Sequence, residues 1–280
     1  MDAVGRDPST STRRVSRRTG LSHSTVHRIW KSNNLYPYHK QKVQKLKPRD
    51  FPLRTAFCHF YRQRCQQDPE FASRVLFSDE ATFSQDGILN TRNNHTWSVE
   101  NPNDTYEHSH QDRFSVNIWM GIIGDHLIGP YMMPDRLNAH AYLVFLSEVL
   151  PELLEEVPLE VRQNMWYHHD GAPAHYGIGV QNFLHLNYPE RWIGRGRRAP
   201  VRWPPRSPDF NPLDYFAWGY VKDRVYQTEV ESPEDLVARI LAVAQEIKNS
   251  PDMLRRVRES MLRRCNACIE RDGRTFEQIL

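Results

Sequence analysis

Three aspartates stand in settings that metal-dependent chemistry on phosphodiesters requires. Asp79 and Asp170 each follow an apolar run typical of a buried strand, and Asp214 opens a helix-like segment just after Pro208 and Pro212. Mg²⁺ prefers hard oxygen ligands and keeps several waters, so a few carboxylates suffice to bind it. Two such ions, about 3.5–4 Å apart, stabilise the attacking and leaving oxygens of an in-line displacement. Three convergent aspartates would fit such a site, with one bridging both ions and one at each flank.

The elements around these aspartates predict a mixed sheet flanked by helices. Strands are expected at 74–78, 115–123, 127–133, 165–169 and 191–193; helices are expected at 53–67, 138–156, 176–186 and 214–226, with two or three more before residue 280. In an open α/β sheet, ligands gather at the carboxyl ends of strands. Asp79 and Asp170 both end a predicted strand, so their carboxylates meet if the two strands are adjacent and parallel.

A very basic segment precedes this sheet. Residues 1–50 contain 12 Lys and Arg against 3 Asp and Glu, whereas the remainder contains 25 against 31. A basic arm on a mildly acidic body indicates a polyanionic partner, although a solvated, disordered tail has the same composition. Residues 9–33 also predict two helices around Gly20-Leu21-Ser22, with Ser22 as the second N-cap and Val26, Ile29 and Trp30 on one inward face.

This layout is typical of a helix-turn-helix whose second helix enters a major groove. Many small helical pairs imitate it, but the charge of the arm favours a DNA reader. The outward side chains of the second helix are His23, Ser24, His27, Arg28 and Lys31. The linker that follows contains Pro37, Pro48 and Pro52, and its Lys40 and Lys42 either follow a phosphate backbone or serve solubility.

Bulk properties exclude several classes of protein. Hydrophobic content of 39% is typical of a globular chain. No run approaches the roughly 18 apolar residues of a membrane span, and the first 20 residues show no secretory signal, so no membrane partner is expected. The pair Cys265 and Cys268 has the spacing of half a zinc site, but Cys58 and Cys65 do not complete it, which favours four ordinary reduced cysteines.

Three motifs together resemble a known family. They are Phe77-Ser78-Asp79-Glu80, His169-Asp170-Gly171-Ala172-Pro173-Ala174-His175, and Ser207-Pro208-Asp209-Phe210-Asn211-Pro212-Leu213-Asp214. The chain resembles a mariner-type transposase of the DDE/D superfamily, from about residue 10 to its end. This resemblance implies an α/β RNase H-like catalytic domain and a catalytic, metal-binding triad of Asp79, Asp170 and Asp214. Asp209 lies in the same motif, but the family places its third carboxylate after the Asn-Pro-x element, which selects Asp214.

The resemblance also implies a division of the chain and a reaction. A helix-turn-helix at 1–36, equivalent to the second of the family's usual pair, precedes a basic linker and helix at 37–70, the catalytic domain at 71–228 and C-terminal helices at 229–280. The expected activity is binding of terminal inverted repeats, hydrolysis of a phosphodiester and strand transfer with two Mg²⁺ or Mn²⁺ ions. A homodimer on double-stranded DNA in the nucleus is expected.

Some residues keep two interpretations. Residues 195–203 form an extra stretch before the last motif, and its Arg195, Arg197 and Arg198 either contact DNA or belong to a solvated loop. His175 either helps to position a phosphate or water, or bonds locally at a helix start. Glu80 alternates to the face opposite Asp79 and is interpreted as structural.

Two rival functions remain open from sequence. The first is a sequence-specific DNA-binding protein without catalysis, which Asp170→Ala would distinguish because only an enzyme loses activity. The second is an RNase H-like nuclease acting on RNA–DNA hybrids, against which the N-terminal module and the last motif argue.

Overall fold

The computed structural model describes residues 2–38, 43–85, 87 and 114–280. The chain divides into two compact units, Met1–Lys42 and Val43–Leu280. Among the described residues, no helix is long and apolar enough to cross a membrane.

The N-terminal unit contains a helix pair of the predicted kind, preceded by a further short helix. The three helices are α1 (Asp2–Arg6), α2 (Thr12–Thr19) and α3 (His23–Ser32). Gly20 closes α2 in the left-handed conformation at φ 75°, and Ser22 caps α3 by accepting a hydrogen bond from the Thr25 amide. Val15 and Val26 are buried between the helices, whereas Ile29, predicted to face inward, is 37% exposed because so small a unit has little interior.

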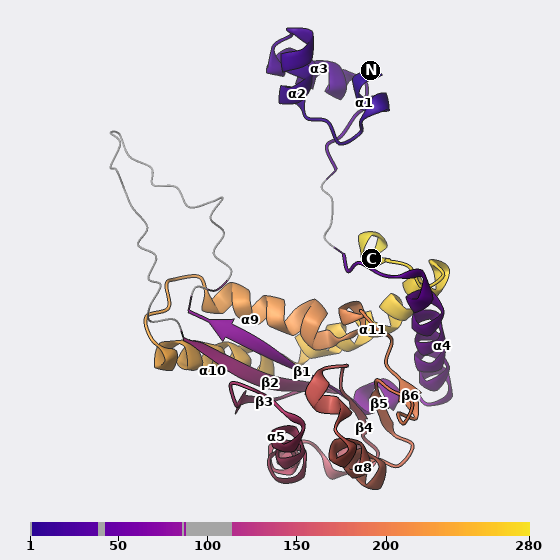
Figure 1. The fold of residues 1–280 in the computed structure, drawn as a ribbon, viewed down its shortest axis with the longest axis vertical. Helices are drawn as coiled ribbons and strands as arrows, with labels where there is room; N and C mark the ends of the chain where they lie inside the picture. Colours follow the sequence, from indigo (N-terminus) through magenta and orange to yellow (C-terminus); the bar gives the residue numbers. More distant parts are fainter. Residues whose placement is uncertain (1, 39–42, 86, 88–113) are drawn as a thin grey trace. The chain divides into compact units, whose positions relative to one another are not determined.

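The second unit is built on one mixed sheet of six strands in the order β3-β2-β1-β4-β5-β6 (Figure 1). The strands are β1 (Val75–Ser84), β2 (Ser115–Ile123), β3 (His126–Met133), β4 (Trp166–His168), β5 (Trp192–Gly194) and β6 (Val201–Arg202). The strands β1, β2 and β3 form antiparallel pairs, and β1, β4, β5 and β6 run parallel. The mixed sheet flanked by helices is therefore confirmed.

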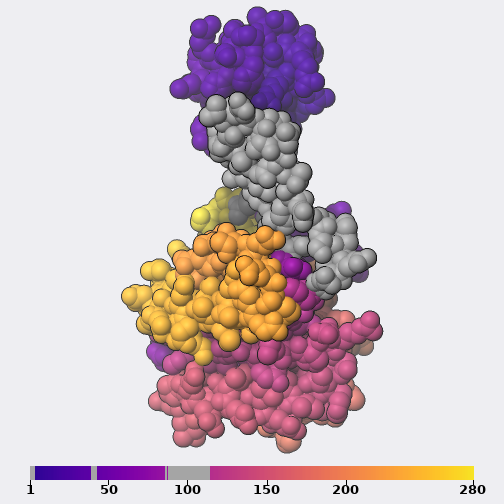
Figure 2. Space-filling model, turned by 90° about the vertical axis from the view of Figure 1, so that its left-hand side faces the viewer, coloured from indigo at the N-terminus to yellow at the C-terminus, as the bar shows by residue number. Residues whose placement is uncertain are grey.

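Helices cover both faces of this sheet (Figure 1), and in Figure 2 the orange-to-yellow C-terminal part of the chain lies on one side of the second unit and the pink middle part on the other. On one face lie α4 (Phe51–Gln67), α9 (Trp218–Val225), α10 (Pro233–Lys248) and α11 (Pro251–Glu270). On the other face lie α5 (Ala139–Val144), α6 (Leu150–Leu153), α7 (Leu159–Gln163) and α8 (Ile178–Asn187). A π-helical turn at Phe145–Val149 joins α5 to α6, so the predicted helix at 138–156 is one continuous helical stretch with an irregular middle.

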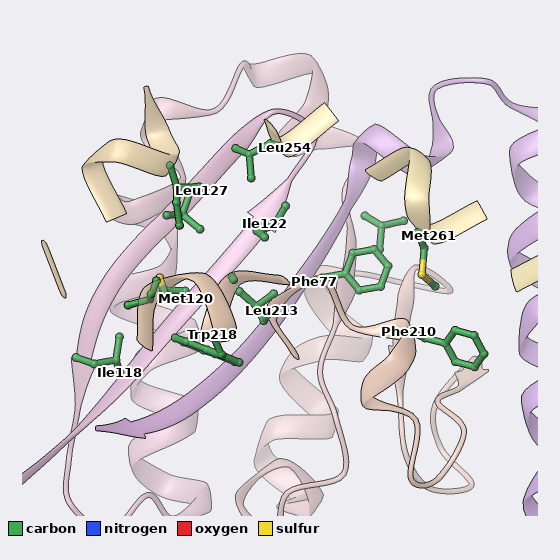
Figure 3. Packing of buried hydrophobic residues seen from close by; sticks show 14 of the residues in the cluster. Phe77, Ile118, Met120, Ile122, Leu127, Phe210, Leu213, Trp218, Leu254 and Met261 are labelled. Carbon is green, nitrogen blue, oxygen red and sulfur yellow. The ribbon is translucent and has the colours of Figure 1, made fainter. Parts of the chain in front are cut away.

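Each face of the sheet has its own apolar core. Figure 3 shows the larger one, in which Ile118, Met120 and Ile122 of β2 lie near Trp218 and Leu254 of the covering helices. The smaller core joins the opposite face of the strands to α5, α6 and α8. Side chains therefore alternate between two buried layers, which explains the continuous apolar runs at 75–77 and 118–123.

Two strands differ from the prediction. The sequence predicts that a strand ends at Asp79, but β1 continues to Ser84, because β2 supplies pairing partners from Phe77 as far as Ser84. The sequence also predicts no strand inside residues 195–203. The structure places β6 there, pairing Val201 with Ile193, and a two-residue strand is too short to show a periodic pattern.

Candidate active site

The parallel pairing of β1 with β4 brings the first two motifs together. Phe77 lies opposite His168 at the end of this pairing, and Asp79 and Asp170 each follow two residues later. The two strands part here, because β1 continues along β2 to Ser84 while β4 ends at His168. A parallel pair of this kind places two carboxylates side by side at one edge of the sheet.

The third motif reaches the same edge through a tightly bonded turn. The Asn211 side chain accepts a hydrogen bond from the Leu213 amide at 3.2 Å, and its carbonyl accepts one from the Tyr215 amide at 3.0 Å. Leu213 is fully buried and anchors the π-helical turn Leu213–Ala217, which continues into α9. The core side chains around this turn therefore leave Asp214 on the outside, facing the pocket.

Asp79, Asp170 and Asp214 line one open pocket of about 300 Å³. Its other walls come from β1, from the segments that follow β4, β5 and β6, and from the third motif: Glu80, Gly171, Arg195, Trp203, Pro204, Arg206, Ser207, Pro208 and Asn211. Motifs up to 135 positions apart in the chain thus bring three aspartates to one cavity.

The carboxylates of this pocket disfavour one another's ionisation. Burial, reinforced by the negative charge of Asp214, raises the pKa of Asp79 well above its usual value, although a hydrogen bond from Trp218 Nε1 to Oδ2 at 2.8 Å opposes this. Partial desolvation and the charge of Asp170 raise the pKa of Asp214 to about 7, even though this residue is exposed. A cluster of like charges of this kind is stabilised by a bound cation.

Asp170 differs because a buried histidine holds it. His175 Nδ1 lies 3.0 Å from Asp170 Oδ1, which also accepts a hydrogen bond from the Ala172 amide at 2.8 Å. His175 Nε2 lies 3.4 Å from Glu80 Oε2, an ion-pair distance without hydrogen-bond geometry. Burial alone would lower the pKa of His175, but its contacts with Asp170 and Glu80 raise it to about 10, so the ring is a cation between two carboxylates.

Glu80 also lines the pocket, which the sequence did not indicate. Alternation along β1 does send Asp79 and Glu80 to opposite faces, toward Trp218 and His175 respectively. The pocket at the edge of the sheet is reached from both faces, so Glu80 lines it as well. Ligand atoms of Glu80, Asp170 and His175 lie within 4.8 Å of one another. A protonated ring at this position offsets part of the negative charge of the two carboxylates.

Asp209 belongs to the same motif as Asp214 but is placed quite differently. Its two carboxylate oxygens accept hydrogen bonds from Arg54 Nη1 and Nη2 at 2.7 and 2.5 Å, and both side chains are buried. Arg54 also donates to the Ser207 hydroxyl and to the Gly273 carbonyl, each at 2.8 Å. Asp209 therefore joins α4 and the C-terminus to the third motif, and does not line the pocket.

The residues predicted to contact DNA lie in three places. His23, Ser24, His27, Arg28 and Lys31 are all exposed on α3. Lys40 and Lys42 lie outside the described residues. Arg197 and Arg198 are exposed and Arg195 is partly buried in the turn after β5, where Arg198 donates a hydrogen bond to Asn182. Trp203 in the same stretch is 6% exposed and packs against Phe57, so it is a core residue.

Solved structures show which fold this is. A Mos1 transposase paired-end complex with the left transposon end matches with a TM-score of 0.75 at 18% identity, covering 99% of this chain and 78% of that one. A pre-cleavage Mos1 transpososome matches with a TM-score of 0.76 over the same shares of both chains, also at 18% identity.

The chain has the fold of the Mos1 transposase. The Mos1 catalytic domain alone matches with a TM-score of 0.61 at 18% identity, covering 85% of this chain and all of that one. The predicted RNase H-like fold class, with a helical N-terminal part, is therefore confirmed. No protein-family model matches the chain, and no curated protein is significantly similar to it in sequence.

Proposed function

We propose that this protein is a mariner-type DDE/D transposase that hydrolyses a phosphodiester at a transposon end and transfers the freed strand to target DNA. The observation that carries the proposal is the convergence of Asp79, Asp170 and Asp214 in one pocket, each from a separate motif. The fold supports it, because solved structures of that fold are described as Mos1 complexes with a transposon end and as a strand transfer complex.

The pocket fits divalent cations that prefer oxygen. Asp79 Oδ1 and Asp170 Oδ2 have no hydrogen bond within the described residues, because Trp218, His175 and Ala172 engage the other oxygen of each carboxylate. Glu80 Oε1 is buried and lacks a partner there too. Asp79, Asp170 and Asp214 would hold two Mg²⁺ or Mn²⁺ ions, and matching Mos1 structures are described as complexes with Mn or with Mg.

When bound, the ions would lower the pKa of a water and stabilise charge on the attacking and leaving oxygens. The chain's own contribution is to fix the carboxylates before the DNA arrives. Trp218 orients Asp79, and the imidazolium of His175 orients Asp170 while cancelling part of the repulsion around it. The side chain of Arg195 at the rim supplies a positive charge facing an incoming phosphate.

The remaining parts of the chain fit a reaction on DNA ends. We assign residues 1–36 to repeat recognition through the exposed face of α3, and residues 37–70 to a linker and helix. Residues 71–228 form the catalytic domain, which the C-terminal helices of 229–280 cover. We further propose a homodimer that pairs two ends, acting in the nucleus where its DNA substrate lies.

The proposal is tested with the full chain and duplexes that carry the inverted repeats flanking its gene. Labelled strands are followed with Mg²⁺, with Mn²⁺ and with EDTA, for the wild type, Asp170→Ala and the matched control Asp252→Ala, an exposed aspartate of α11. We expect metal-dependent cleavage by the wild type and the control. We expect Asp170→Ala to bind the duplex without cutting it.

A wild type that binds these duplexes and leaves all of them intact with both metals would overturn the proposal in favour of a DNA-binding protein without catalysis. Cleavage confined to RNA–DNA hybrids would instead identify a nuclease of another kind.

A further inference from the structure

A groove of about 690 Å³ adjoins the active-site pocket, and Arg195 and Trp203 line both. This groove, called here the side groove, lies between α4 and the stretch that follows β5. It is lined by Leu53, Ala56, Phe57, Phe60, Tyr176, Arg195, Gly196, Arg197, Pro200, Val201, Arg202, Trp203 and Pro205. A strand of DNA that leaves the carboxylates can therefore enter the side groove directly.

The apolar walls of the side groove suit a flat ring. Phe57 and Trp203 line the groove as buried side chains that meet edge to face with ring centroids 4.9 Å apart, and Phe60 of α4 is partly exposed beside them. Tyr176 lines the side groove next to Gly196 and has 43% of its surface exposed, although it is a large aromatic residue. Bases of single-stranded nucleic acid stack on aromatic side chains of this kind.

The charged side chains of the side groove are all positive. Arg195, Arg197 and Arg202 form no hydrogen bond or ion pair with any described residue, and no acidic residue lines the side groove. Guanidinium groups without a partner are well suited to phosphate oxygens, which they bind in a bidentate manner. The side groove is therefore complementary in charge to a nucleic acid backbone, in contrast with the acidic pocket beside it.

Two glycines give this wall its shape. A side chain at Gly171 would collide with Arg195, so the absence of one lets Arg195 lie across the turn that follows Asp170. Gly196 has φ +107°, a conformation that other residues rarely adopt, and packs beside the ring of Tyr176. The local backbone thus sets a cation next to the catalytic carboxylate and an aromatic ring one step further along.

We propose that the side groove binds unpaired nucleotides of the DNA strand on which the active site acts. Arg195 holds a phosphate adjoining the scissile one, Arg197 and Arg202 hold the next part of the backbone, and a base stacks on Tyr176. The volume lies within the roughly 300–1,000 Å³ of pockets that enclose small ligands, which is enough for a short stretch of single strand. This inference rests on the proposed function and adds that the strand is melted beside the cut.

The test uses the full chain in EDTA, with single-stranded oligothymidine that carries one 2-aminopurine. Excess unlabelled duplex of unrelated sequence occupies the basic N-terminal arm. Binding is measured by anisotropy and stacking by quenching of the 2-aminopurine, for the wild type, Tyr176→Ala, Tyr176→Phe and Arg197→Ala. Arg256→Ala, an exposed arginine of α11 outside the side groove, is the matched control.

We expect Tyr176→Ala to abolish the quenching and to weaken binding roughly 5- to 150-fold, as loss of one stacked base does. Tyr176→Phe, which keeps the ring, and Arg256→Ala should behave as the wild type, and Arg197→Ala should weaken binding while keeping the quenching. Quenching that survives in Tyr176→Ala, or binding that the duplex removes entirely, would overturn the inference.

Asp170→Ala separates this inference from the proposed function. It should bind and quench the oligothymidine as the wild type does, because the side groove is unchanged. If the wild type cuts no duplex but its quenching depends on Tyr176, the groove site stands and the transposase proposal fails. If duplexes are cut while quenching ignores Tyr176, the reverse holds.

Discussion

Asp209 and Asp214 lie five positions apart in one motif, yet the fold treats their charges in opposite ways. Asp209 is buried and receives two hydrogen bonds from Arg54, so its charge is neutralised inside the protein. Asp214 is exposed at the pocket, where desolvation and the charge of Asp170 raise its pKa to about 7. A carboxylate paired within the chain stabilises the fold, whereas one left among like charges is available to a cation.

The largest expected effect is on catalysis at Asp214. Asp214→Asn should reduce the rate of duplex cleavage by on the order of 10³-fold or more, because the pocket loses one of its three aspartates while DNA binding elsewhere is intact. Asp223→Asn, at an exposed position on α9, should leave the rate unchanged. The measurement is single-turnover cleavage in Mg²⁺. Equal rates for the two variants would remove Asp214 from the triad.

Removing Arg54, the partner of the buried Asp209, should lower the stability of the fold. Arg54→Ala leaves the Asp209 charge buried without its partner and removes the donors to Ser207 and Gly273, so we expect a loss of about 3–5 kcal/mol in the free energy of unfolding. Urea unfolding followed by fluorescence measures it, with Arg256→Ala expected to change stability by less than about 0.5 kcal/mol.

The double variant Arg54→Met/Asp209→Leu sharpens this test. Removing both charges together should cost less than Arg54→Ala alone, because no buried charge is left unpaired. A double variant that is less stable than the single one would show that packing around Arg54, and not its charge, holds the third motif.

A smaller effect on the cleavage rate is expected at His175. Its buried ring pairs with Asp170, a carboxylate of the pocket, as Arg54 pairs with Asp209. His175→Gln keeps a polar side chain but loses the positive charge between Asp170 and Glu80. We expect cleavage to slow by about 10–100-fold, as is typical when the partner of a metal-binding carboxylate is removed. His59→Gln, at an exposed position on α4, is the control. A rate within twofold of the wild type would limit His175 to a packing role.

The smallest expected effect is on stability, which the substitution Asp214→Asn should increase although it slows cleavage. The pKa of Asp214 is about 7 in the folded protein and about 3.8 for an unperturbed aspartate, so folding favours its protonated form. This contribution to stability is complete below pH of about 4 and is lost as the pH rises through 7. In EDTA at pH 8, Asp214→Asn should therefore be more stable than the wild type, by on the order of 1 kcal/mol after solvent screening.

Urea unfolding of both proteins at pH 8 and at lower pH checks this expectation. The advantage of the variant should shrink as the pH approaches about 4, where the wild-type carboxylate is protonated in both states. No difference at pH 8 would mean that the charge of Asp214 is already compensated without metal.

The sequence predicts most of the sheet, because apolar runs such as 115–123 are long enough to show their pattern. It also predicts that Asp79 and Asp170 end two strands, and the structure shows that the strands carrying the two motifs, β1 and β4, are parallel neighbours. Other features depend on contacts between distant segments. Arg54 and Asp209 are 155 positions apart, so their pairing has no local signal. Likewise, alternation assigns Glu80 to the correct face but cannot show that His175 approaches it there.

The choice between Asp209 and Asp214 illustrates the limit of sequence reasoning. Both are acidic residues beside prolines in one motif, and only the resemblance to a known family separates them. The structure supplies a physical reason, since Arg54 engages both oxygens of Asp209. A partner that neutralises a charge cannot be seen from the motif alone.

The contacts of Arg54 with Asp209 and with Gly273 also bear on the order in which the protein can fold during synthesis. Arg54 donates to the carbonyl of Gly273, and Phe276 stacks on Phe210 of the third motif with ring centroids 5.4 Å apart. Arg54 and the third motif are therefore synthesised before the residues at 273 and 276 that hold them in place. A nascent chain still held on the ribosome short of these positions lacks the contacts that secure the third motif. The third-motif wall of the acidic pocket is thus secured only after residues 273–276 have emerged, which would keep the proposed DNA-cutting site unfinished until that point.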